Sequence, residues 1–225
     1  MTLYWRLIKA FKEMNMTAPA HVHSAHFTTL AAALLNDRFT DDKTRTYLAK
    51  AVMVIMGSLL IASAAQVAVP MYPVPVTGQT LAILLIGMTY GSRMAGCTVA
   101  LYLFEGALGL PVFANGASGA LYMFGPTGGY LAGFLIAAVT LGYMAERGMG
   151  RTMISTAAMM LIGTTVIYVF GVAWLSMMIG FEKAVIHGVM PFLYGDVLKA
   201  VVAAGLMPLA WKSIKKLGTD TGDNG

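Results

Sequence analysis

Three ionisable residues stand within or at the ends of long apolar stretches of this sequence: Glu105, Asp196 and Lys199. A charged side chain at membrane depth is costly and by default indicates a functional site. Asp196 and Lys199 are three positions apart in PFLYGDVLKA, so on a helix they share one face. Lys199 could supply a cation for a ligand carboxylate, and Asp196 could accept hydrogen bonds from ligand N–H groups. The alternative is an ion pair that neutralises itself. We favour binding, because desolvating such a pair costs free energy that an apolar pair would not lose.

A Gly- and Pro-rich stretch provides a further polar candidate. Residues 106–130 read GALGLPVFANGASGALYMFGPTGGY and cannot be helical throughout. Inside a membrane protein such backbone is tolerated only where protein buries it or where it lines a cavity. Asn115 offers both a donor and an acceptor, which suits an amide or a urea; alternatively, it is a turn residue that tolerates positive φ. Glu105, just before this stretch, receives no role beyond a possible helix cap.

Aromatic side chains at the same level are either walls of a site or an interfacial belt. They are Phe113, Tyr122, Phe124, Tyr130, Trp174 and Phe192.

Two enzymatic motifs need to be considered. GPTGGYL lacks the Lys of a Walker A loop, so active transport would draw on partner proteins or a gradient. Residues 116–119 match the GxSG of rhomboid intramembrane serine proteases, which would make Ser118 the nucleophile and His187 its partner. His187 lies in a polar connection without the expected neighbours, so we rank catalysis well below binding. No cofactor or metal site is predicted: Cys97 is the single cysteine, and the N-terminal His21, His23 and His26 lack a fourth ligand type.

The composition indicates which elements must position these residues. The chain has 225 residues, of which 58% are hydrophobic and 11% charged, and its mean hydropathy is +0.72. These values are typical of an integral membrane protein and leave room for one membrane domain. The net charge of +5 comes from residues at the ends of apolar segments, so lipid rather than nucleic acid is the expected surrounding.

We predict an all-α membrane protein with six transmembrane helices and irregular outward-facing loops. The expected spans are 47–69, 79–90, 94–110, 128–145, 152–171 and 190–211, with 174–188 as a connection. The membrane domain is expected at 47–212. Residues 213–225 would form a cytoplasmic tail. Residues 1–46 would form another, disordered or lying on the membrane surface, with Leu3, Leu7 and Phe11 on one helical face.

The distribution of basic residues predicts the orientation. Lys183 is alone on one side, whereas the other side carries Lys43, Arg45, Lys50, Arg93, Arg147, Arg151, Lys212, Lys215 and Lys216. Both termini are therefore expected in the cytoplasm. The irregular segments 70–79, 106–130 and 174–189 would then share the outer face, where an incoming ligand would meet them.

Four separated blocks together resemble the BioY family, the biotin-specific substrate-binding components of energy-coupling factor (ECF) transporters. The blocks are VPVTGQTL (74–81), GALGLPVFANGASG (106–119), GPTGGYLAGF (125–134), and Asp196 with Lys199. The resemblance covers about residues 47–212 and leaves the first 46 unmatched. It implies a six-helix protein in the cytoplasmic membrane that binds biotin on its outer side.

The same resemblance implies partners and residue roles. Biotin would be delivered through a transmembrane coupling protein and a pair of ATP-binding-cassette ATPases. Asn115 and Asp196 would hold the ureido ring, Lys199 would hold the valerate carboxylate, and Thr77 and Tyr130 would line the pocket.

Two further positions matter for assembly. Ser58 and Ala62 occupy the place where the first helix of the family carries an Ala-xxx-Ala contact with the coupling protein. From the residues alone, other small carboxylates bearing an amide would also fit the site. A biotin transporter that works without ATPase partners is the alternative from the same class.

Overall fold

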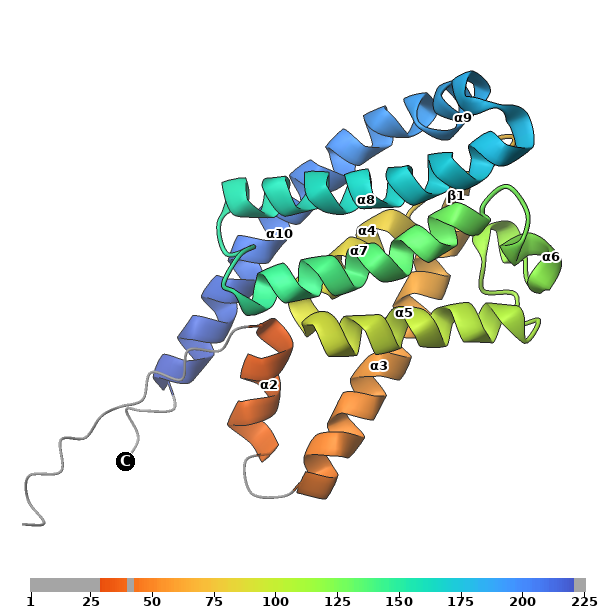
Figure 1. Cartoon of the computed structure of the whole chain (residues 1–225). Coiled ribbons are helices and arrows are strands. Elements are labelled where there is room, and N and C mark those ends of the chain that lie inside the picture. The colour runs from red at the N-terminus through yellow and green to blue at the C-terminus, as the bar shows by residue number, and fades with distance from the viewer. Residues whose placement is uncertain (1–28, 40–42, 221–225) are drawn as a thin grey trace, which may run out of the picture.

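The computed structural model describes residues 29–39 and 43–220, and these residues are almost entirely helical (Figure 1). The predicted mainly helical fold is thereby confirmed. One small antiparallel ribbon interrupts it, in which β1 (Ala68–Val69) pairs with β2 (Val76–Thr77). The predicted surface helix around Leu3 and the histidines at 21, 23 and 26 lie outside the described residues.

Four described segments are long and apolar enough to cross a membrane. They are α3 (Lys43–Gln66), α7 (Gly128–Glu146), α8 (Met153–Ile179), and the segment Phe181–Ile214, which contains α9 (Phe181–Gly188) and most of α10 (Met190–Asp220). The helices α4 (Gln79–Tyr90) and α5 (Ser92–Ala107) have 12 and 16 residues. At 1.5 Å per residue these two helices extend about 18 and 24 Å, less than the ~30 Å of a hydrocarbon core.

The expected boundaries near the C-terminus need correction. The stretch 174–188, predicted as a connection, is helical, because α8 continues to Ile179 and α9 follows directly. Gly180 alone separates them, and its φ of 85° allows the sharp change of direction. The last helix also continues beyond 212, to Asp220. Polar residues after 174 and after 212 therefore do not end the helices where the sequence predicted.

The N-terminal boundary also differs from the expectation. Helix α2 (Leu30–Phe39) lies within the predicted tail, yet it packs against α3, α4 and α10. Its buried residues are Leu30, Ala31, Ala33 and Leu35. The helical unit therefore includes residues well before 47, because even a short apolar stripe is stabilised when a neighbouring bundle covers it.

Helix α7 is central to the packing, with α8, α4 and α5 in contact with it. It lies between α8 and α5 in Figure 1. A Cβ atom on Gly129 would clash with the backbone of Phe170 in α8, and one on Gly142 would clash with the backbone of Ser92 in α5. Small residues at these positions let the helix backbones approach closely, as is usual where lipid provides no hydrophobic drive for association.

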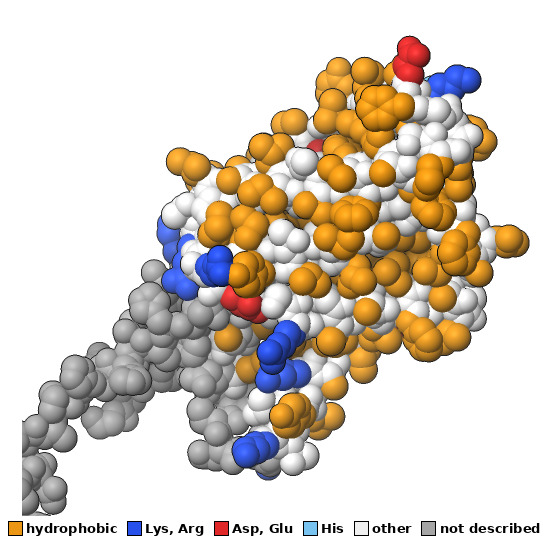
Figure 2. Space-filling model, viewed as in Figure 1, with side chains coloured by type: hydrophobic (Ala, Val, Ile, Leu, Met, Phe, Trp, Pro, Cys, Tyr) orange, Lys and Arg blue, Asp and Glu red, His pale blue; other side chains and the backbone are white. Residues whose placement is uncertain are grey.

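The outer surface is mostly apolar. Figure 2 shows hydrophobic side chains over most of the visible middle of the molecule, with Lys and Arg side chains gathered toward one end. An acidic and a basic side chain stand at the opposite end, where α9 carries the exposed Glu182 and Lys183. Such a surface suits contact with lipid, and the long apolar helices support the predicted multi-pass membrane protein.

Candidate ligand-binding site

A cavity opens between α4, α7, α8, α10 and the chain around β2. Together with the space that is open to the outside, it encloses about 520 Å³. Its walls are mostly apolar and aromatic, with a few polar groups. The lining residues are Val74, Pro75, Thr77, Gln79, Thr80, Tyr122, Thr127, Tyr130, Leu131, Phe134, Thr164, Ile167, Tyr168, Phe192, Asp196 and Lys199.

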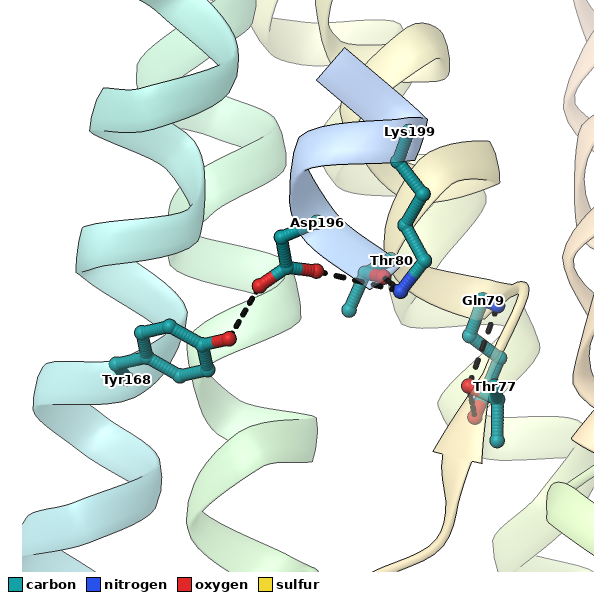
Figure 3. Close-up of polar contacts among 6 residues, drawn as sticks. All are labelled: Thr77, Gln79, Thr80, Tyr168, Asp196 and Lys199. Atoms are coloured by element: carbon teal, nitrogen blue, oxygen red, sulfur yellow. Dashed lines mark hydrogen bonds and ion pairs between the residues drawn. The ribbon is translucent and has the colours of Figure 1, made fainter. Parts of the chain in front are cut away.

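Asp196 and Lys199 lie three residues apart on α10 and both line this cavity. Figure 3 shows the Asp196 carboxylate reaching toward Tyr168 and the Lys199 amino group toward Thr80. The Lys199 Nζ lies 3.3 Å from Asp196 Oδ1 and donates a hydrogen bond of 2.6 Å to Thr80 Oγ1 on α4. The Tyr168 hydroxyl on α8 donates to Asp196 Oδ2. Both charged side chains are largely buried, with exposed fractions of 12% for Lys199 and 14% for Asp196. Three helices thus hold one anion and one cation side by side in a partly desolvated site, where charge-assisted hydrogen bonds are strong.

A second hydrogen-bonded group lies near β2. The Thr77 hydroxyl donates to Gln79 Oε1 at 3.1 Å, and the backbone N–H of Gln79 donates back to Thr77 Oγ1 at 3.2 Å. Gln79 Nε2 in turn donates to the Tyr102 hydroxyl on α5, which donates to the Val112 carbonyl at 3.1 Å. This chain of bonds connects the cavity wall to the base of the 113–116 turn.

Tyr130 forms part of the aromatic wall. Its ring stacks on Phe192 with centroids 6.2 Å apart, and its hydroxyl donates to the Gly188 carbonyl at 2.8 Å. A Cβ atom on Gly171 would clash with this ring, so Gly171 makes room for it. Tyr130 therefore connects α7 to the junction of α9 and α10 while its face contributes to the cavity.

Tyr122 adds a neutral polar group to the lining. It lies in the short helix α6 (Ala120–Met123), and burial raises the pKa of its hydroxyl above the ordinary value. A tyrosine hydroxyl is protonated at neutral pH even at its ordinary pKa, and burial makes its ionisation still less favourable, so this group is able to donate a hydrogen bond.

Asn115 is the predicted site residue that the structure does not bring to the cavity. It is exposed in η1 (Ala114–Gly116) and has a left-handed φ of 57°, which agrees with the alternative of a turn residue. Gln66 at the end of α3 holds this turn: its Nε2 donates to the Phe113 carbonyl at 3.1 Å, and its Oε1 accepts from the Gly116 N–H at 3.0 Å. A ligand-binding role for Asn115 stays a prediction.

The predicted partner-contact residues face inward. Ser58 is fully buried and donates a hydrogen bond to Glu105 Oε2 on α5, while Ala62 is partly buried against the core. This position of Ser58 does not support a contact with another protein. Glu105, to which the sequence assigned no role, therefore links α5 to α3 by accepting this hydrogen bond.

Three cavity residues that hydrogen-bond to predicted site residues were not recognised in the sequence: Gln79, Thr80 and Tyr168. Gln79 and Thr80 belong to the VPVTGQTL block, so their position in that block was an available signal. Tyr168 had none, since a tyrosine in an apolar helix is usually an ordinary packing residue.

The chain is similar to proteins of one known family. Residues 27–216 match the BioY family, so the match begins well before residue 47, where the resemblance was expected to start. A protein named probable biotin transporter BioY from Pyrococcus horikoshii is 38% identical to this chain, over 67% of this chain and 89% of its own length. The biotin transporter BioY of Rhizobium etli is 36% identical, over 73% of this chain and 90% of its own.

A solved structure has the same fold. It is the crystal structure of the S-component for biotin from an ECF-type ABC transporter, with a TM-score of 0.67 and 21% sequence identity. The alignment covers 76% of this chain and 95% of the solved chain. With the match extending over most of its length, the chain belongs to the BioY family.

Proposed function

We propose that this protein binds biotin and mediates its uptake across the membrane as the substrate-binding component of an ECF-type transporter. The observation that carries the proposal is the cavity in which Lys199 and Asp196 lie 3.3 Å apart, in a chain of the BioY family. Biotin has one carboxylate, one neutral urea and an apolar bicycle. The cavity offers one cation, one anion and aromatic walls, which is the complementary set.

The proposed residue roles follow the chemistry of the ligand. Lys199 pairs with the valerate carboxylate, Asp196 accepts hydrogen bonds from the ureido N–H groups, and Thr77 and Tyr130 line the pocket. In the structure Lys199 donates to Asp196 and Thr80, and these bonds would yield to the ligand. The Asn115 side chain is exposed in the structure. It could hydrogen-bond to the ureido ring only if the 113–116 turn moved toward the cavity.

Energy for transport would come from other subunits. The sequence has no Walker A motif, and relatives are named biotin transporters. We therefore propose a transmembrane coupling protein and ATP-binding-cassette ATPases as partners, with lipid around the remaining surface. The coupling protein is expected to contact Ser58 and Ala62, but the Ser58 side chain is fully buried within this chain.

The orientation is part of the same proposal. Helix α9, which carries Lys183, lies at one end of the molecule, and the start of α3 and the α7–α8 connection, which carry basic residues, lie away from it (Figure 1). This arrangement favours cytoplasmic termini. Six membrane passages would follow if the short helices α4 and α5 both cross, and the cavity would then open outward. The membrane is the cytoplasmic membrane in this proposal.

The rhomboid-type protease is no longer a competing function. The BioY family comprises transporters, and among the described residues no hydrogen bond joins Ser118 to His187. Transport without ATPase partners remains the second hypothesis. Uptake of labelled biotin into vesicles containing this protein alone, compared with vesicles that also contain the coupling protein and ATPases, distinguishes the two.

The direct test is calorimetric titration of the purified protein with biotin in detergent. We expect saturable binding with one biotin per chain. A protein that is monodisperse and correctly folded but does not bind biotin would contradict the proposed function.

A further inference from the structure

Tyr168 separates the ligand cavity from a second hollow. On the exposed side of α8 and α10 lies an apolar groove lined by Ala157, Met160, Leu161, Thr164, Thr165, Tyr168, Leu193, Asp196, Val197 and Ala200. Three of these residues, Thr164, Tyr168 and Asp196, also line the ligand cavity. The Asp196 carboxylate therefore stands between two spaces, and on the groove side most of its neighbours are apolar.

The Tyr168 hydroxyl determines which way this carboxylate is held. It donates to Oδ2, while Lys199 Nζ approaches Oδ1, so each carboxylate oxygen has its own partner (Figure 3). The Tyr168 ring is itself held edge-on against Phe192, with centroids 6.3 Å apart and planes at 66°. Phe192 thus packs against Tyr168, and Tyr168 in turn donates a hydrogen bond to the Asp196 carboxylate.

We propose that Tyr168 is a positioning residue that holds the Asp196 carboxylate toward the ligand cavity and away from the groove. It thereby determines the preference of the site for ligands with N–H donors. An ionised carboxylate is an acceptor only, so its direction decides whether ligand N–H groups meet it at hydrogen-bonding geometry. Without the tyrosine hydroxyl, only Lys199 holds the carboxylate, through Oδ1, and Oδ2 is able to turn toward either space. The inference rests on the proposed biotin binding and adds a determinant of selectivity to it.

The test measures the affinities of Tyr168→Phe for biotin and for a biotin methylated on a ureido nitrogen. Phenylalanine keeps the ring, its packing on Phe192 and the wall between the two spaces. We expect biotin to bind roughly ten-fold more weakly, because the hydrogen bond from the ligand N–H to the carboxylate weakens when the direction of the carboxylate is no longer held. The methylated analogue, which already lacks an N–H, should lose much less affinity, so that discrimination between the two ligands shrinks. Equal weakening of both ligands would contradict the inference.

Tyr194→Phe is the matched control. Tyr194 lies on α10, two residues from Asp196, but it is 88% exposed and does not line the cavity. This substitution should leave both affinities and their ratio unchanged.

A double-mutant cycle with Asp196→Asn shows whether Tyr168 acts through Asp196. We expect Tyr168→Phe to cost little further affinity in the Asp196→Asn background, since the group it positions has gone. Full additivity of the two losses would overturn the inference, as would a Tyr168→Phe variant with wild-type affinity and selectivity. Failure of the wild-type protein to bind biotin would instead contradict the proposed function.

Discussion

The amino group of Lys199 is held by one charged and one neutral partner, both of which a ligand can replace. It contacts Asp196 on the same helix and Thr80 on α4, so in the structure the lysine is already aimed at the cavity. Asp196 and Lys199 can therefore form an ion pair in the free protein and still bind a ligand. In the proposed function, ligand binding would exchange one set of charge-assisted bonds for another.

Lys199→Met tests this role directly. We expect biotin affinity to fall by one to two orders of magnitude, because a hydrogen bond to a charged group contributes about 1.5–3 kcal/mol. An uncharged biotin amide should lose much less, since it has no carboxylate for the lysine to meet. Titration of both ligands measures the difference. Lys183→Met, at an exposed position on α9, is the control and should alter neither affinity. Equal losses for the two ligands would assign Lys199 a structural role.

Ser58 and Glu105 form a polar contact that belongs to stability rather than to the ligand. The buried hydroxyl of Ser58 donates to Glu105 across the interface of α3 and α5. Ser58→Ala should lower the free energy of unfolding by about 1–3 kcal/mol, because the glutamate loses its donor in a partly buried place. Thermal unfolding in detergent, together with a biotin titration, checks it. Stability should fall while biotin affinity stays.

Ser63→Ala is the control for this prediction. Ser63 lies on the same helix, is exposed, and bonds only to the Leu59 carbonyl one turn earlier. Its substitution should hardly change stability. If Ser58→Ala unfolds at the same temperature as Ser63→Ala, the contact with Glu105 does not stabilise the fold.

At the scale of elements, the end of α3 controls the turn that carries Asn115. Gln66 bonds to backbone groups on both sides of Asn115, and its side-chain amide replaces partners that an irregular turn cannot provide for itself. The turn therefore depends on a residue almost fifty positions earlier in the chain. For Asn115 to reach the ligand, the turn would have to leave the position in which the two Gln66 hydrogen bonds hold it.

Gln66→Ala should loosen this turn without disturbing the helices. We expect faster amide hydrogen exchange at residues 113–116, because two bonds to the turn backbone are lost. Exchange in α7, which Gln66 does not contact by any hydrogen bond of the described residues, serves as the internal reference. Unchanged exchange at 113–116 would show that other contacts hold the turn.

At the scale of the whole molecule, the cavity exists because four helices converge on it from distant parts of the sequence. Thr80 comes from α4, Tyr130 from α7, Tyr168 from α8 and Lys199 from α10. Close packing through the glycines of α7 brings α8 and α5 together around that central helix. The site is consequently sensitive to any substitution that separates α7 from its neighbours, even one far from the ligand.

The amino-acid sequence was sufficient to recognise an integral membrane protein and the charged residues of its candidate site. High hydropathy and sparse charge require a membrane, and the two charged residues in PFLYGDVLKA identified the polar centre of the site, because burying charge without use is costly. The ordered motif blocks placed the chain in its family. Thr77, Tyr130, Asp196 and Lys199 were found in this way, and all four line one cavity.

Which of these groups contact one another depends on how the helices pack. Tyr168 is an ordinary aromatic residue of a long apolar helix until α10 brings Asp196 to its hydroxyl. Ser58 seemed to offer a small external contact, but α5 covers it. From the composition of a segment one can estimate the free energy of placing its side chains in lipid or in water. The choice of hydrogen-bond partner depends on helix packing between segments more than a hundred residues apart, as for Lys199 and Thr80.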